Sequence, residues 1–211
     1  MSRLSFRAAL QFAYEQLANH LLPELHYHSY DHTRIEVVTV IKRLSRHEGI
    51  TGRERQLLIT AAAYHDVGWT LVRSTGPEYQ EQRRLHEELG CQIASQNLPK
   101  FGYLADDIAT VVRIIMATKL PTAPKDKLEM VMCDADLASL GYSVATYWRR
   151  SFDLRHELEE FNTKFGDKEW YSFQIQFLTN HRYYTESARQ IFDQNKRKAL
   201  LELHNKLSSF S

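Results

Sequence analysis

Four side chains that bind protons and metal ions occur within otherwise apolar segments of this sequence. His65 and Asp66 stand side by side in "LLITAAAYHDVGWT", His32 opens "HTRIEVVTVI", and Asp136 lies in "MVMCDADLASL". An ionisable group is costly to bury unless a partner satisfies it. Imidazole nitrogens and carboxylate oxygens are the ligands that borderline or hard divalent metals choose. We therefore expect three core-facing helices that share one metal ion.

Each of these residues also has an interpretation without a metal. His65 could be a histidine at a helix C-terminus, where the helix dipole favours it, and Asp66 could be the residue that caps that helix. His32 fits a cap at a helix start. Asp134 and Asp136 lie about 200° apart on a helix, so both cannot point at one ion. The metal interpretation is preferred because the whole set occurs together.

The elements that would position these residues are expected to be helices, which makes the predicted fold class all-α. The sequence has only 5 proline and 8 glycine residues, and alternating strand patterns are nearly absent. The first expected helix spans about 4–22. The second runs from near His32 to Gly49 and carries Ile35, Val38, Ile41 and Leu44, and the third runs from Thr51 toward His65. Further helices are expected over about 78–96, over about 104–118, from near Lys125 through Asp136 and over about 144–165, and two more follow.

Several residues predict where these helices begin and end. Pro23 should stop the first helix, and Thr51 with Glu54 forms a capping box for the third. Gly68 and "STGPE" are expected to form a loop, in which Gly68 frees the chain to turn away beside the metal. Gly166 is expected to stop the helix that begins near residue 144.

Composition indicates a soluble globular protein. The chain has 211 residues, of which 43% are hydrophobic and 25% charged, and its net charge is +1. A net charge this small does not indicate an extended surface that binds nucleic acid. A small phosphorylated substrate needs only a few local cations, so it remains compatible with this charge. No apolar run approaches a membrane span, and the N-terminal segment lacks the features of a secretory signal. With Cys91 and Cys133 far apart, we expect a cytoplasmic protein with no membrane partner.

The order His32, His65, Asp66, Asp136 resembles the HD-domain superfamily of all-helical, metal-dependent phosphohydrolases, named for its His-Asp doublet. "YHSYDHT", "AAAYHDVGW", "HEELGCQIA", "IIMATK", "DADLASLG" and "FLTNHRYYT" resemble its branch of predicted metal-dependent phosphohydrolases, over about residues 27–207. The resemblance implies that His32, His65, Asp66 and Asp136 hold one divalent ion, and it selects Asp136 over Asp134. We expect one HD-type domain over 1–211, with a core of about 26–142 and a C-terminal helical extension of about 143–207 packed on it.

One departure from the family pattern concerns a second metal. Relatives with two metals usually add a histidine after the doublet and a His-His pair on the next helix. His86 stands at the first place, but Ala117 and Thr118 stand at the second. A single ion is therefore expected, and Mn, Fe, Co, Ni, Mg and Zn all suit the ligand set.

The expected chemistry is hydrolysis by a metal-activated water. Asp66 is the candidate catalytic residue, because it can act as a ligand and also orient that water. Charge that grows on the phosphoryl oxygens needs cationic or hydrogen-bonding groups. The candidate substrate-binding residues are His28, His86, Lys119 and Arg73.

Some alternatives stay open. Lys119 also fits a solvated lysine at a helix C-terminus, and Arg155 or His181 could reach the pocket. The expected substrate is a phosphomonoester or phosphodiester of nucleotide-like character. A regulatory module that binds a nucleotide without turnover is the main alternative, and an oxygenase with a diiron centre ranks lower because it needs more ligands. The sequence leaves the oligomeric state open.

Overall fold

The computed structural model describes residues 5–73, 79–161 and 163–210. Within these ranges every regular element is helical, which confirms the all-α prediction. The α-helices are α1 (Phe6–His20), α2 (Val38–His47), α3 (Gly52–Tyr64), α4 (Tyr79–Arg84), α5 (His86–Asn97), α6 (Ala105–Met116), α7 (Lys127–Asp136), α8 (Val144–Glu160), α9 (Asp167–Asn180) and α10 (Glu186–Ser208). Shorter turns are η1 (His32–Val37, π-helical) and the 3₁₀ turns η2 (Val67–Leu71), η3 (Leu98–Phe101) and η4 (Ala138–Gly141).

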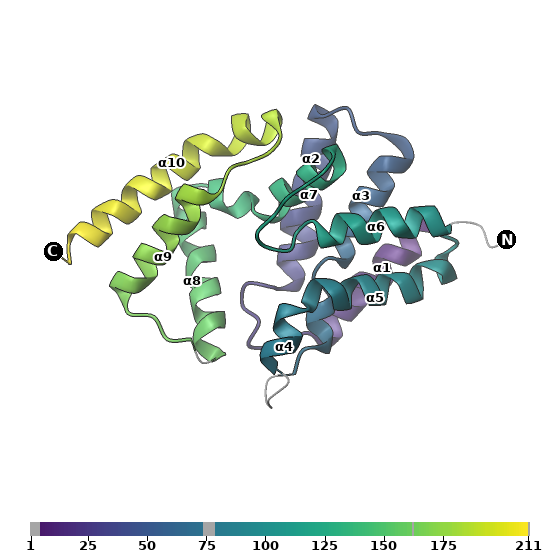
Figure 1. The fold of residues 1–211 in the computed structure, drawn as a ribbon, viewed down its shortest axis with the longest axis horizontal. Coiled ribbons are helices and arrows are strands. Elements are labelled where there is room, and N and C mark those ends of the chain that lie inside the picture. Colours follow the sequence, from purple (N-terminus) through teal and green to yellow (C-terminus); the bar gives the residue numbers. More distant parts are fainter. Residues whose placement is uncertain (1–4, 74–78, 162, 211) are drawn as a thin grey trace.

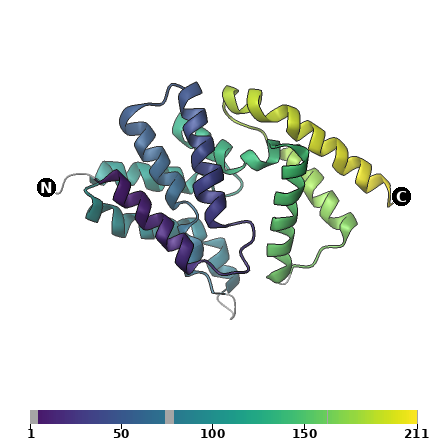
Figure 2. The same cartoon turned by 180° about the vertical axis from the view of Figure 1, so that it is seen from behind.

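The helices form two groups that lie side by side. Helices α1 to α7 pack together on one side of the molecule, and α8, α9 and α10 lie on the other (Figures 1 and 2). The chain passes from the first group to the second through η4, which follows α7 directly. The two termini lie at opposite ends of the molecule in both views.

Helix α3 runs through the centre of the larger group. All of its residues from Leu57 to Tyr64 are buried, and the small side chains of Ala61, Ala62 and Ala63 are fully covered. Small side chains let neighbouring helices approach closely, so the C-terminal part of α3, which has no polar face, is stable at this buried position. Tyr183 and Phe192 from the C-terminal part belong to the same buried cluster, which shows that the second group packs on the first.

Gly68 has a structural role that differs from the predicted one. It lies in η2, and a Cβ atom built there would stand 1.8 Å from the carbonyl oxygen of His86 on α5. The glycine is required because η2 and α5 are in backbone contact, and the expectation of a free turn was wrong. The "STGPE" segment, residues 74–78, lies outside the described residues.

Two predicted helices end differently. The helix expected over 78–96 is divided into α4 and α5 at Leu85, whose φ of −111° and ψ of 13° are not helical. The helix expected to reach 165 ends at Glu160, because Phe161 leaves it to pack with Trp69 and its neighbours. Gly166 is the N-cap of α9 and not the stop of α8.

Two smaller expectations also fail. Thr51 is the N-cap of α3, but its side chain makes no capping hydrogen bond. Gly52 follows it with φ of +53°, and this left-handed entry differs from the backbone of a capping box. Ile35 is 57% exposed, so the apolar face of α2 begins after it. No helix in the described ranges is long and apolar enough to cross a membrane.

Candidate metal centre

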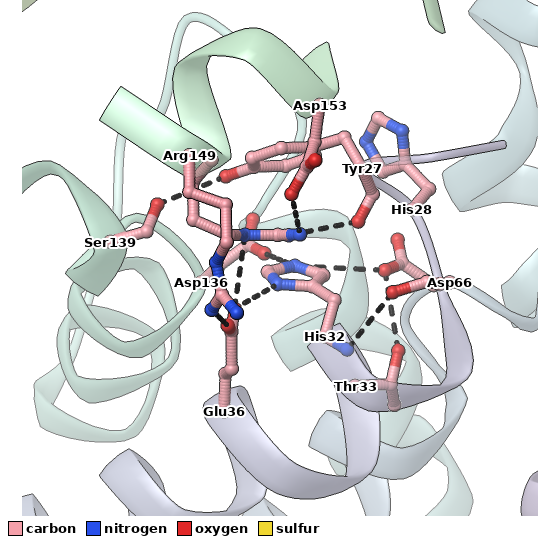
Figure 3. Close-up of polar contacts among 12 residues, drawn as sticks. Tyr27, His28, His32, Thr33, Glu36, Asp66, Asp136, Ser139, Arg149 and Asp153 are labelled. Atoms are coloured by element: carbon pink, nitrogen blue, oxygen red, sulfur yellow. Dashed lines mark hydrogen bonds and ion pairs between the residues drawn. The ribbon is translucent and has the colours of Figure 1, made fainter. Parts of the chain in front are cut away.

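The structure brings the four predicted ligands together from four elements. His32 is the first residue of η1, His65 follows α3, Asp66 precedes η2, and Asp136 ends α7. The Nε2 atom of His65 lies 3.2 Å from both Asp66 Oδ2 and Asp136 Oδ1. The Nε2 atom of His32 lies 3.3 Å from Asp136 Oδ1 and 3.8 Å from Asp66 Oδ2 (Figure 3).

The donor atoms fit a single divalent ion. Ligand atoms about 2.1 Å from one ion lie roughly 3 to 3.5 Å apart, close to the separations found here. His32, His65 and Asp66 each offer a donor atom within 4.8 Å of the others. His65 Nε2 is buried and has no hydrogen-bond partner among the described residues. Such an orphaned atom facing two carboxylates is the arrangement that a metal would satisfy.

Both imidazole rings are oriented through their other nitrogen. His65 Nδ1 donates to the carbonyl oxygen of Ala62 at 2.8 Å, which leaves Nε2 facing the centre. His32 Nδ1 lies 3.3 Å from Glu36 Oε2, one turn along the helix. Contacts of this kind fix the tautomer and the ring orientation of metal-binding histidines.

The electrostatics of the centre favour cations. Burial disfavours the imidazolium form of His65, but the Asp66 and Asp136 carboxylates outweigh it and raise the pKa well above its usual value. Burial also acts to raise the pKa of Asp66, and the neighbouring histidines overcome it, so that this pKa lies well below its usual value. The cluster therefore attracts protons or a metal ion, and the two compete.

Helix α8, which belongs to the second group of helices, contacts residues around the centre through Arg150. Arg150 Nη2 donates to the carbonyl oxygen of Tyr27 at 2.9 Å, and its Nε lies 3.3 Å from Glu36 Oε2. Its guanidinium carbon stands 4.2 Å from the centre of the Tyr27 ring. These residues were missed in the sequence. The sequence held a signal only for Glu36, because its i,i+4 spacing from His32 places the two side chains on one face of a helix.

His28 lies beside the centre in a cluster of rings. The ring centroids of His28 and His86 each lie 4.5 Å from that of Trp69 and 5.9 Å from each other, so the three rings form a compact cluster. His28 Nδ1 lies 2.5 Å from Glu157 Oε1, and the backbone N–H groups of Tyr27 and His28 donate to Glu157 Oε2. Burial disfavours the charged form of His28, but Glu157 outweighs it and raises the pKa.

A cavity of about 510 Å³ opens beside the candidate ligands. His65, Asp66 and Asp136 form part of its wall, and Asp136 is the most exposed of the four ligands at 20%. The predicted substrate residues His86 and Lys119 also line this cavity. His28 and Arg73 are not among the lining residues, and Arg73 Nη1 instead donates to the carbonyl oxygen of Thr70.

The charges on the cavity wall differ from those expected. Lys119 is paired with Glu88. Burial and the nearby charge of His28 lower the pKa of His86 to about 4, so His86 offers a hydrogen bond and not a charge. Arg83 and Arg84, which sequence reasoning missed, also line the cavity, and the structure records no ion pair for either guanidinium within the described ranges.

Three other predicted or possible site residues lie elsewhere. Arg155 bonds Glu159, Asp167 and the carbonyl oxygen of Phe165, so it orders the turn after α8. His181 lines a different hollow together with Tyr184. Asp134 accepts hydrogen bonds from Tyr184 N and from the N and Oγ1 of Thr185.

A second group of donor atoms lies on the surface. His26, His156 and Glu160 each offer one atom within 4.8 Å of the others, and His156 and Glu160 are exposed. The His26 and His156 rings are stacked with centroids 4.4 Å apart. Because these side chains are solvated, they lack the buried, oriented character of the centre around His65.

The fold and the site together define an all-helical protein with a buried His/Asp centre beside a cavity. The family model for the HD domain matches residues 30–139, which is 110 of the 211 residues and includes all four candidate ligands. The chain belongs to the HD domain family, whose members are largely metal-dependent hydrolases. Comparisons with curated proteins and with solved structures found no match.

Proposed function

We propose that this chain is a metal-dependent phosphohydrolase that cleaves a phosphomonoester or phosphodiester of nucleotide-like character. The observation that carries the proposal is the orphaned Nε2 of His65, which faces two carboxylates at the wall of a cavity. Two guanidinium groups, of Arg83 and Arg84, line the same cavity. A divalent-cation site and two arginines without an ion pair among the described residues, in one cavity, suit a phosphate ester.

His32, His65, Asp66 and Asp136 would hold one divalent ion, of Mn, Fe, Co, Ni, Mg or Zn. When bound, such an ion supplies an acidic water and polarises a phosphoryl oxygen. Asp66 Oδ2 accepts from Thr33 Oγ1 at 3.3 Å, whereas Oδ1 has no partner recorded in the described ranges. Asp66 would act as a ligand whose second oxygen orients the attacking water and accepts a hydrogen bond from it.

The remaining cavity residues would bind the phosphoryl group. Arg83 and Arg84 supply positive charge toward the oxygens on which negative charge grows. Lys119 contributes less, because Glu88 neutralises it locally. His86, neutral near pH 7, donates its Nδ1–H to the carbonyl oxygen of Arg83, so its Nε2 would accept a hydrogen bond from a substrate hydroxyl group or a water molecule.

Activity of an Asp66→Ala variant tests this proposal. Wild type loaded with each divalent metal is screened on p-nitrophenyl phosphate, bis-p-nitrophenyl phosphate and nucleotides. Asp66→Ala should lose bound metal and phosphoesterase activity together, whereas Asp106→Ala, an exposed aspartate on α6, should keep both.

Three results would contradict the proposal in different ways. Full activity in metal-free Asp66→Ala would exclude metal-dependent hydrolysis. Two iron atoms per chain without phosphoesterase activity would favour an oxygenase. Nucleotide binding without hydrolysis would favour a regulatory module.

A further inference from the structure

A second cavity lies where the two groups of helices meet. Tyr27 and Ser139 line it from one side, and Leu154 of α8 and Gln174 of α9 line it from the other. Leu137, which directly follows Asp136, lines this cavity and also the one at the candidate metal centre, as Leu120 does. The two cavities are therefore neighbours on either side of Leu120 and Leu137.

The size of this cavity limits what it can hold. Its volume is about 130 Å³. An apolar cavity of about 150 Å³ in another protein holds one benzene molecule. This slightly smaller cavity therefore has room for no more than one six-membered ring. Leu140, Leu154 and Phe177 supply apolar surface for such a ring.

Gln174 provides a specific polar group in the cavity wall. Its side chain is only 2% exposed, and its Oε1 accepts from the Tyr147 hydroxyl at 2.8 Å. Its Nε2 has no hydrogen-bond partner among the described residues. A buried donor without a partner is destabilising, and a carbonyl oxygen on a bound ring would satisfy it.

Arg150 is the one cationic residue in the part of the lining that the structure describes, and carboxylates balance its charge. Arg150 donates to Asp153 and to the carbonyl oxygen of Tyr27, and it stands beside Glu36. The cavity therefore has no spare charge for an ionised ring substituent. An uncharged ring matches this lining.

We propose that this cavity binds the organic part of the substrate, and that this part is one uncharged six-membered ring carrying a carbonyl oxygen, as in a pyrimidine base. The phosphate end of the same substrate lies at the metal centre, and for that end the inference rests on the proposed function. Helices α8 and α9 thus supply substrate selectivity to a centre that is built by the first group of helices.

Two variants of the cavity test this assignment. Leu154→Phe fills the space, and Gln174→Leu removes the donor with little change of volume. Gln176→Leu is the matched control, because Gln176 is exposed on the same helix and does not line the cavity. Thermal unfolding of each variant establishes that it is folded before it is used.

The kinetic arm compares three substrates that share the same 5′-phosphate ester: uridine monophosphate, adenosine monophosphate and ribose 5-phosphate. In wild type, kcat/KM for uridine monophosphate should exceed both others by about 10-fold or more. Leu154→Phe and Gln174→Leu should each remove most of this preference while hydrolysis of ribose 5-phosphate continues, and Gln176→Leu should keep it. Equal kcat/KM for the three substrates in wild type would overturn the inference.

The binding arm uses uridine, which has no phosphate and needs no hydrolysis. Saturation-transfer NMR should detect uridine on wild type and on Gln176→Leu, with the signal lost in Leu154→Phe. If no nucleotide is hydrolysed while this binding pattern holds, the proposed function fails and the cavity assignment stands. If ribose 5-phosphate is hydrolysed and uridine does not bind, the cavity assignment fails and the proposed function stands.

Discussion

His32 and His65 reach the same point from different elements, and each is oriented through its Nδ1 atom. For His65 the partner is a helix carbonyl oxygen, that of Ala62, which no side-chain substitution removes. For His32 the partner is the carboxylate of Glu36, which Arg150 holds in place. The orientation of His32 therefore depends on one replaceable side chain.

Replacing that carboxylate should weaken metal binding. Glu36→Gln removes the negative charge that favours the tautomer of His32 with its proton on Nδ1, which leaves Nε2 free to bind the metal. We therefore expect metal affinity to fall by about 10- to 100-fold. Isothermal titration of metal into the chelator-treated protein measures this change. Glu54→Gln, at an exposed position on α3, is the control. Equal affinity in Glu36→Gln and wild type would show that Glu36 does not position His32.

The sequence allowed some site residues to be predicted and hid others. His65, Asp66, His32 and Asp136 drew attention because ionisable groups in apolar segments need a partner, and the resemblance to the HD-domain superfamily selected Asp136 over Asp134. Glu157 was not, because it lies in a charged helix segment and its contact with His28 joins residues 129 positions apart. Arg83 and Arg84 were not predicted for a similar reason. Two adjacent arginines in a polar segment are typical of a solvent-exposed surface, and the sequence does not indicate that they line a cavity.

At the scale of elements, close backbone contact between η2 and α5 fixes the segment that follows the His-Asp doublet. Gly68→Ala would place a methyl group 1.8 Å from the carbonyl oxygen of His86, so the two elements must separate. We expect a loss of about 3 kcal/mol or more in the free energy of unfolding, measured by denaturant titration.

Gly166→Ala is the matched control for this substitution. A Cβ atom at Gly166 meets nothing closer than Glu169 Oε2 at 3.6 Å, at the end of a flexible side chain. Its cost should stay below about 1 kcal/mol. Similar costs at Gly68 and Gly166 would contradict the backbone contact between η2 and α5.

Helix existence could be predicted from the sequence, but helix ends often could not. Periodicity located every α-helix except the division between α4 and α5. That division at Leu85 and the early end of α8 depend on tertiary contacts, with Gly68 in one case and with Trp69 in the other. Local sequence carries no signal for contacts of this kind.

The end of α9 carries a pH-dependent contribution to stability. Burial and the neighbouring ammonium of Lys196 lower the pKa of His181 to about 4 from an ordinary value of 6.5. Between these values the unfolded chain binds more protons than the folded one, so the stabilisation present above pH 6.5 is lost as the pH falls toward 4. His181→Gln should lose less stability than wild type between pH 7 and pH 4.5.

Urea unfolding at several pH values measures this difference. His204→Gln, at an exposed position on α10, should follow the wild-type profile. A constant stability difference between His181→Gln and wild type across the range would contradict the lowered pKa.

At the scale of the whole molecule, the centre joins segments that are far apart in the chain. Its ligands come from η1, the ends of α3 and α7, and the start of η2, and α8 braces them from the second group of helices. A metal that binds these ligands only in the folded state must stabilise the entire fold. Stability and metal content are therefore linked.

Removing the metal should lower the melting temperature. At a free metal concentration of about 100 times Kd, binding adds about 2.7 kcal/mol, which corresponds to a shift of roughly 5 to 10 °C for a chain of this size. Differential scanning calorimetry with and without a chelator measures the shift. Asp66→Ala should show no shift, and Asp106→Ala should show the full one. A chelator-insensitive wild type would contradict the linkage.

The most direct test of the central claim is elemental analysis of bound metal per chain. It is best made in a His156→Ala background, which removes the exposed His26, His156 and Glu160 group as a source of metal. We predict about one divalent ion per chain in this background and close to none when Asp66→Ala is added. Metal content unchanged by Asp66→Ala, or no metal retained after loading, would contradict a metal centre at His32, His65, Asp66 and Asp136.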